Sequence, residues 1–208
     1  MYERHFGLRE LPFSLTPDTG FYLAEGPAQE ALEMLMVALD AGEGFVKVTG
    51  EVGTGKSMVC RKLLNTLDHR FYTAYIPNPG LTPAAVNRAL AEELGLELPR
   101  NLHKHALYKR IALRLIDLAR EGRRTVLCID EAQAMPLETL EAVRLLTNLE
   151  TEKRKLLHIV LFAQPELDEQ LAQPQARQLR QRITFACRLR PLDRSAVDRY
   201  LHHRLASA

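Results

Sequence analysis

Five short apolar runs alternate with amphipathic stretches along this chain. The runs are residues 44–50, 71–76, 124–130, 156–164 and 183–190, and each has the length and composition of a buried strand. Strands that alternate with helices predict parallel crossovers and an α/β sandwich. Apolar residues recur at helical spacing in residues 28–42, 56–69, 83–95, 103–122 and 136–150.

The junction between the first strand and the next helix carries the pattern G-x-x-x-x-G-K-[ST]. In such a loop the backbone N–H groups surround phosphates, the lysine reaches the terminal phosphates and the hydroxyl binds Mg²⁺. A position between a strand and a helix N-terminus is the context in which this motif binds nucleotide. We therefore predict an ATP site made by Gly50, Glu51, Val52, Gly53, Thr54, Gly55, Lys56, Ser57 and Met58.

Two adjacent acids end the apolar run TVLCI. Hydrolysis of a bound nucleotide needs a carboxylate near Mg²⁺ and a group that orients the attacking water. We assign Asp130, together with Ser57, to Mg²⁺, and Glu131 to the water as a general base. The alternative is that the acids only end a strand; the upstream phosphate loop argues against it.

Further polar residues follow the later strands. Gln164 ends the run HIVLFA, where an amide at the sheet edge can contact the γ-phosphate or the water. A glutamine that caps a loop is the alternative. Arg177, Arg180 and Arg182 precede the last strand, and an arginine here can complete the site of a neighbouring subunit. We rank Arg180 before Arg182, and a solvated basic helix face would look the same.

Composition narrows the classes of protein. The chain has 208 residues, 46% hydrophobic and 26% charged, which fits a soluble domain with a proper core. Its net charge of +2 gives no support for a nucleic-acid partner. Cys60, Cys128 and Cys187 are far apart among apolar neighbours, so we predict core residues and a reducing compartment.

The chain shows neither an apolar leader at its N-terminus nor a run of apolar residues long enough to span a membrane. These features predict a cytoplasmic protein that meets the inner membrane only peripherally or through further chain.

Several segments together resemble one family. MYERHFGLRELPFSLTPD, GEGFVKVTGEVGTGKSMVCRKLL, AYIPNP, IDEAQAMPLETLEAVRLLTNLETEKRKLL, LFAQPELDEQL and LRQRITFACRLRPLD are similar to the AAA+ ATPases of the general secretion pathway protein A (ExeA) type. Among these, the chain resembles most the ATPases of MSHA type IV pilus biogenesis. The similarity spans nearly the whole chain, including segments outside the nucleotide motifs.

The resemblance implies an AAA+ P-loop NTPase of the ASCE class, with a five-stranded parallel sheet in a three-layer sandwich. It implies an N-terminal arm near the adenine in residues 1–27, including Phe6, a nucleotide-binding core in 28–191 and the start of a helical lid in 192–208. Family members often carry a histidine at the position of Ala28, so an adenine contact by that side chain is not expected here.

Only one helix follows the last strand, and one helix cannot make an AAA+ lid. We therefore expect the 208 residues to be cut from a longer chain, and to bind nucleotide weakly and turn it over slowly.

The implied function is a Mg²⁺-dependent ATPase that drives assembly of a type IV (MSHA) pilus or a type II secretion apparatus. Its implied partners are copies of itself, with Gln164 as the first sensor and Arg180 or Arg182 as the finger, and inner-membrane assembly proteins. Two alternatives remain open. One is a DNA-associated ATPase of the transposition-helper or replication-loader kind, and the other is a nucleotide-gated scaffold that does not hydrolyse ATP.

Overall fold

A parallel sheet of five strands forms the centre of the protein. The computed structural model describes residues 2–208 apart from residues 15, 78–79, 81, 100–101 and 152–153. The strand order is β2-β3-β4-β1-β5, and the pairings are all parallel. The strands are β1 (Phe45–Gly50), β2 (Phe71–Ile76), β3 (Arg124–Ile129), β4 (Leu157–Ala163) and β5 (Phe185–Leu189).

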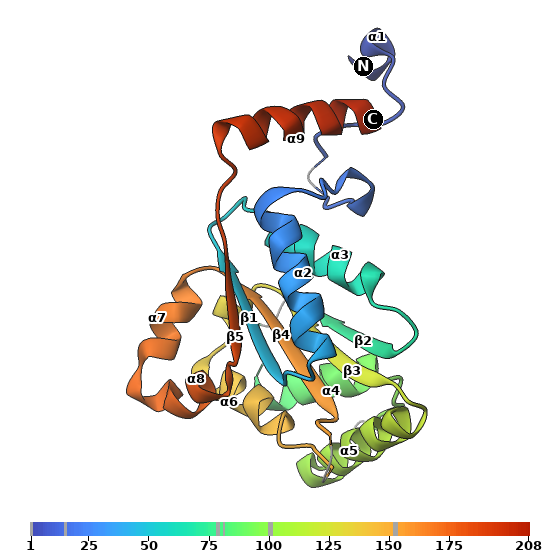
Figure 1. The fold of residues 1–208 in the computed structure, drawn as a ribbon. Coiled ribbons are helices and arrows are strands. Elements are labelled where there is room, and N and C mark those ends of the chain that lie inside the picture. The colour runs from blue at the N-terminus through green and yellow to red at the C-terminus, as the bar shows by residue number, and fades with distance from the viewer. Residues whose placement is uncertain (1, 15, 78–79, 81, 100–101, 152–153) are drawn as a thin grey trace.

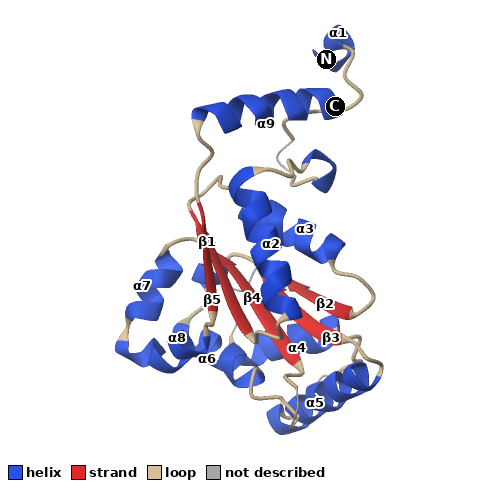
Figure 2. Ribbon diagram, viewed as in Figure 1, coloured by secondary structure: helices blue, strands red, loops and turns tan. Residues whose placement is uncertain are grey.

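Helices cover both faces of this sheet, which gives three layers (Figures 1 and 2). One face carries α2 (Gly26–Asp40) and α3 (Lys56–Thr66). The other carries α4 (Pro83–Glu93), α5 (Lys104–Arg120), α6 (Leu137–Leu146), α7 (Glu166–Ala172) and α8 (Arg177–Arg182). Outside the sandwich lie α1 (Tyr2–Phe6) and α9 (Arg194–Ser207). Among the described residues, no helix is both long and apolar enough to cross a membrane.

Both faces of the central strands are apolar. Along β4 every residue is buried, and successive side chains enter opposite cores, as with Leu161 and Phe162. This continuous burial is what a parallel sheet with helices on both faces requires. Cys60 and Cys128 lie in the core as predicted, whereas Cys187 is half-buried because it belongs to the edge strand β5.

The strand order determines which loops meet. β4 lies between β1 and β3, so the residues that follow these three strands share the carboxyl edge of the sheet. The phosphate loop follows β1, Asp130 follows β3 and Gln164 follows β4. Open α/β sheets bind their ligands at this edge.

The five predicted strands and the α/β sandwich are confirmed, and the predicted helices differ mainly at their ends. The helix expected over residues 136–150 stops at Leu146, with Thr147 as its C-cap. The short helices α7 and α8 were not predicted as separate elements. In the described part of the chain there are also three short 3₁₀ turns: η1 (Thr19–Phe21), η2 (Ala132–Ala134) and η3 (Pro174–Ala176).

Candidate functional site

The glycines of the phosphate loop occupy positions where a side chain would be strained or would clash. Gly53 and Gly55 have φ of 81° and 90°, in the left-handed region that side chains disfavour. At Gly50 a Cβ atom would lie 2.7 Å from Oγ1 of Thr54 and 2.9 Å from the carbonyl oxygen of Leu189. The loop therefore turns tightly and passes directly against the end of β5.

Lys56 begins α3 and is buried, with 6% of its surface exposed. Its Nζ atom donates to the carbonyl oxygens of Gly50 and Glu51 at 2.8 and 2.9 Å. These bonds hold the ammonium inside the curve of the loop, where the motif requires it to meet phosphate.

Asp130 lies opposite the start of α3. It is 4% exposed, and the side chain of Ser57 lies beside its carboxylate. Burial raises the pKa of this carboxyl group, while the Ser57 hydroxyl, the N–H of Glu131 and the nearby Lys56 charge act in the opposite direction. The phosphate loop and the acid strand, predicted to form one site, thus meet in the structure.

The donor atoms in this place suit Mg²⁺. That ion binds through one or two protein oxygens, with water and substrate phosphates filling its other positions. The hydroxyl of Ser57 and the carboxylate of Asp130 supply such oxygens side by side. Among the described residues there is no cluster of three or more His, Cys, Asp or Glu that could hold a metal alone, so phosphate oxygens would have to complete the coordination.

Glu131 has an unusual backbone. Its φ of 53° makes it the only non-glycine residue with positive φ in the described part of the chain. Such a conformation costs energy and occurs often at functional sites. It turns the chain sharply after Asp130, whose Oδ1 accepts from the N–H of Glu131 at 3.0 Å. The carboxylate of Glu131 then lies within 3.3 Å of the side-chain nitrogen of Gln164, which places the predicted base and sensor together.

Gln133 is a residue of this site that was not predicted. Its Nε2 atom donates to Oε2 of Glu131 at 2.6 Å, and its Oε1 atom accepts from the N–H of Gln164 at 3.0 Å. The only signal in the sequence is its position two residues after Glu131, in the segment DEAQ.

The structure does not bring Arg180 and Arg182 to this site. Both lie on α8, which precedes β5, whereas the phosphate loop follows the parallel strand β1, so they lie toward the opposite edge of the sheet (Figure 1). Arg180 is exposed beside a hollow of about 310 Å³ that Lys47 and Asp168 also line. Arg182 donates to Oδ1 of Asn148 at 2.9 Å. The structure therefore leaves open whether Arg180 belongs to a solvated helix face or reaches a neighbouring subunit.

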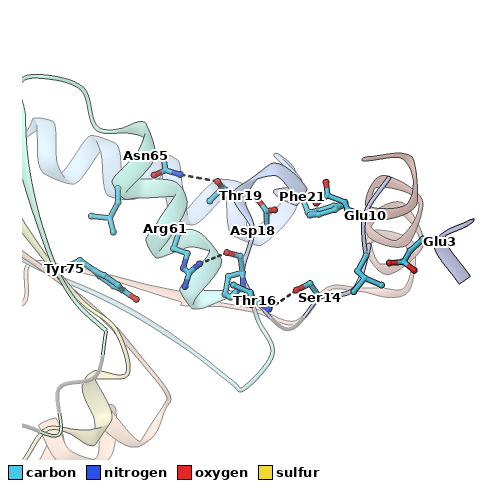
Figure 3. Close-up of a pocket in the computed structure, with 13 residues that line it drawn as sticks. Glu3, Glu10, Ser14, Thr16, Asp18, Thr19, Phe21, Arg61, Asn65 and Tyr75 are labelled. Atoms are coloured by element: carbon cyan, nitrogen blue, oxygen red, sulfur yellow. Dashed lines mark hydrogen bonds between the residues drawn. The ribbon is translucent and has the colours of Figure 1, made fainter. Parts of the chain in front are cut away.

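The N-terminal arm, residues 2–22 as far as they are described, lies along α3. Arg61 donates to the carbonyl oxygen of Pro17 at 2.7 Å, and Asn65 donates to Thr19 at 3.2 Å (Figure 3). Arm and helix enclose a cavity of about 870 Å³ that Tyr75 also lines. Burial raises the pKa of Tyr75 to about 12, so its phenol stays neutral.

Phe6, by contrast, is 69% exposed on α1, which lies beyond α9 from the sheet in Figure 1. The structure therefore does not place this ring beside the phosphate loop.

The sequence and the fold match those of known proteins. A family model described as an AAA domain matches residues 39–171. The chain belongs to this family. It is 43% identical over its whole length to general secretion pathway protein A of Aeromonas hydrophila, of which it spans 38%. The predicted resemblance to that type of AAA+ ATPase is thereby confirmed, for a chain that spans well under half of the relative.

Solved structures show the same AAA+ fold. The ORC2 protein of Aeropyrum pernix, in ADPNP-ADP complexes, aligns with a TM-score of 0.67 and 14% identity over 98% of this chain and 55% of its own. CDC6P from Pyrobaculum aerophilum gives a TM-score of 0.65 and 18% identity over 92% and 54%. At these identities the likeness concerns the fold, a P-loop AAA+ sandwich, and not the function.

Proposed function

We propose that this chain is a Mg²⁺-dependent ATPase core. The observation that carries the proposal is that buried Asp130, at the end of the acid strand, lies beside Ser57 and buried Lys56 of the phosphate loop. The AAA domain match supports it.

In this proposal the loop N–H groups and Lys56 hold the phosphates of ATP. Bound Mg²⁺, held by Ser57 and Asp130, would neutralise phosphate charge. Glu131 accepts a proton from the water that attacks the γ-phosphorus. A bond forms between that water oxygen and phosphorus, and the bond to the β–γ bridging oxygen breaks, which gives ADP and phosphate. Gln164 orients the same water through its amide.

The decisive experiment compares ATP turnover and ATP binding in the chain and in Glu131→Gln. Because the variant loses only the proton acceptor, turnover should fall by about 10²–10⁴-fold, while the dissociation constant for ATP measured by calorimetry stays the same. Exposed Glu138→Gln, on α6, is the matched control and should behave like the parent chain. Equal turnover in Glu131→Gln and the parent would leave a nucleotide-gated scaffold as the better description.

Catalysis would be completed between subunits. The exposed position of Arg180, far along the chain's own sheet from its phosphate loop, supports a role in a neighbouring site. The specific turnover rate should then rise with protein concentration, and Arg180→Ala should abolish that rise. A mixture of Arg180→Ala with Glu131→Gln would regain activity, because some interfaces combine intact Arg180 with intact Glu131. A flat specific rate would contradict this part of the proposal.

The work of the cycle is assembly of an envelope machine, a type IV (MSHA) pilus or a type II secretion apparatus, at the cytoplasmic face of the inner membrane. The identity with general secretion pathway protein A supports this setting. Copurification with inner-membrane assembly proteins in ATP, and its loss in Lys56→Ala, would test it.

A DNA-associated ATPase would instead bind DNA with a steep dependence on salt concentration. The net charge of +2 disfavours that outcome, and a titration across salt concentrations decides it.

A further inference from the structure

We propose that Gln133 is a positioning residue that fixes the carboxylate of Glu131 and ties it to Gln164. This inference rests on the proposed hydrolysis and adds a component that the motif-based assignment lacks. Through the side-chain amide of Gln133, a shift of Gln164, the candidate sensor, would change the position of the Glu131 carboxylate, the candidate base.

The orientation of the Gln133 amide follows from its partners. The main-chain N–H of Gln164 can only donate, so the atom of Gln133 that it meets at 3.0 Å must be the oxygen. The NH₂ group then points at Glu131, whose carboxyl oxygen Oε2 accepts from it at 2.6 Å. Both bonds require the same orientation of the amide. The short bond to a charged acceptor is also the stronger kind of hydrogen bond.

Two donors meet a single oxygen of Glu131. Oε2 receives Nε2 of Gln133 at 2.6 Å and Nε2 of Gln164 at 3.3 Å. Among the described residues, Oε1 has no hydrogen-bond partner, so it is the oxygen that can take a proton from water. Rotation of the carboxylate would break both bonds. The two glutamines therefore hold one oxygen and present the other.

Gln133 is itself held in place from behind. Its backbone carbonyl accepts from the side chain of Gln170 on α7 at 3.0 Å, and it lies in η2 between buried Ala132 and Met135. Those two apolar neighbours pack into the core, whereas the Gln133 side chain is only half-buried. Both polar atoms of its amide bond to Glu131 or Gln164. Removing it should therefore disturb the position of Glu131 more than the stability of the fold.

The test uses Gln133→Ala and Gln133→Met, which lack the amide, in the 208-residue chain. Misplacing a reacting group by about 1 Å costs on the order of 100-fold in rate. We expect kcat to fall about 10–100-fold with KM and the calorimetric dissociation constant for ATP unchanged. Exposed Gln175→Ala, on η3, serves as the matched control. If Gln133 only supported the fold, binding and thermal stability would fall together with kcat.

A double-mutant cycle separates this inference from the proposed function. In a Glu131→Gln background, Gln133→Ala should cause no further loss of turnover, because its effect passes through the missing carboxylate. Full additivity would overturn the positioning role. If Glu131→Gln alone is as active as the parent, the proposed base is wrong. If it is inactive while Gln133→Ala has parental kcat, only the inference about Gln133 fails.

A readout without nucleotide completes the design. In the chain alone, side-chain NH₂ signals of Gln133 and Gln164 in NMR spectra should both move when Glu131 is changed to Gln, and the Gln164 signal should also move in Gln133→Ala. Signals of Gln164 that stay in place in both variants would show that the three residues are not linked, which would overturn the proposal.

Discussion

Two regions of the molecule bury charge in opposite ways. Among the described residues, the buried Lys, Arg, Asp and Glu side chains are Lys56 and Asp130 at the carboxyl edge of the sheet and Arg204 between α9 and the N-terminal arm. The first two carry opposite charges and lie near each other at the phosphate site. Arg204 has no described acid partner. Its guanidinium lies 4.3 Å from the ring centre of Phe21 and donates to the carbonyl oxygen of Pro12.

This difference matches the roles of the two regions: the carboxyl edge is the candidate nucleotide site, and Arg204 attaches the N-terminal arm to α9. A pair of opposite charges at a site can exchange partners when phosphate and metal arrive. A guanidinium held by aromatic rings and a carbonyl depends little on salt and gains nothing from nucleotide. It joins the arm to α9, where the carbonyl of Ala208 also accepts from Glu10 at 3.3 Å. We therefore expect contacts at the carboxyl edge to change when nucleotide binds, and the contacts between the arm and α9 to stay the same.

The largest effect should come from removing the buried cation of the phosphate site. Lys56→Ala removes the donor expected to meet the terminal phosphates, so ATP turnover should fall at least about 100-fold. Calorimetry should also show weaker binding, unlike in Glu131→Gln. Lys62→Ala, which removes a half-buried lysine from the same helix outside the phosphate loop, is the control. Parental affinity in Lys56→Ala would show that the loop does not hold phosphate.

A second change tests the shape of the loop without touching charge. Gly50→Ala places a Cβ atom against the backbone oxygen of Leu189 at 2.9 Å, so loop and β5 must separate. Such overpacking costs about 1–3 kcal/mol of stability, and ATP binding should weaken as the loop shifts. Chemical denaturation and an ATP titration measure the two effects. Gly42→Ala, at a glycine with positive φ outside the site, shows the cost of backbone strain alone.

Arg204→Met is aimed at the second region. It keeps a long apolar side chain but loses the cation and its hydrogen bonds, which should cost about 1–3 kcal/mol. The loss should appear as faster hydrogen exchange in α9 and the arm, with the sheet unchanged. Arg199→Ala breaks an exposed ion pair to Glu25 at 2.9 Å and should cost at most about 1 kcal/mol. Equal exchange in the two variants would show that Arg204 attaches the arm to α9 no more strongly than an exposed ion pair does.

The smallest effect concerns Asp130 in the absence of nucleotide and metal. Its pKa is raised by burial, so the folded state favours the protonated form. That contribution to stability is fully present below the ordinary aspartate pKa of about 3.9 and is lost as pH rises through the raised value. Asp130→Asn should therefore unfold at a higher temperature than the parent at pH 7, with the gap closing at low pH.

Asp117→Asn, an exposed aspartate on α5, is the control for that measurement. A parent that is more stable than Asp130→Asn at pH 7 would show that the bonds from Ser57 outweigh the cost of burial.

The strands and the phosphate loop could be predicted because burial and backbone geometry act locally. Glycines such as Gly53 and Gly55 in a tight loop predict positive φ, and an apolar run such as β4 predicts a strand that is buried on both faces. Helices α7 and α8 are only 7 and 6 residues long, too short to show helical periodicity.

The candidate site was less accessible to sequence reasoning. Ser57, Asp130 and Glu131 follow a known spacing, but the bond between Gln133 and Gln164 joins positions 31 residues apart. No local pattern encodes that contact, which depends on β4 pairing with β3. Gln164 lies between the two motif strands because β4, which it follows, is between β1 and β3.

The close approach of Gly50 to Leu189 has a mechanical consequence. Strand β5 begins just after α8 and ends against the phosphate loop, and it is only five residues long. A strand of that length extends roughly 17 Å. A displacement of Arg180 by an adjoining molecule would therefore be transmitted along β5 to the phosphate loop of the same chain.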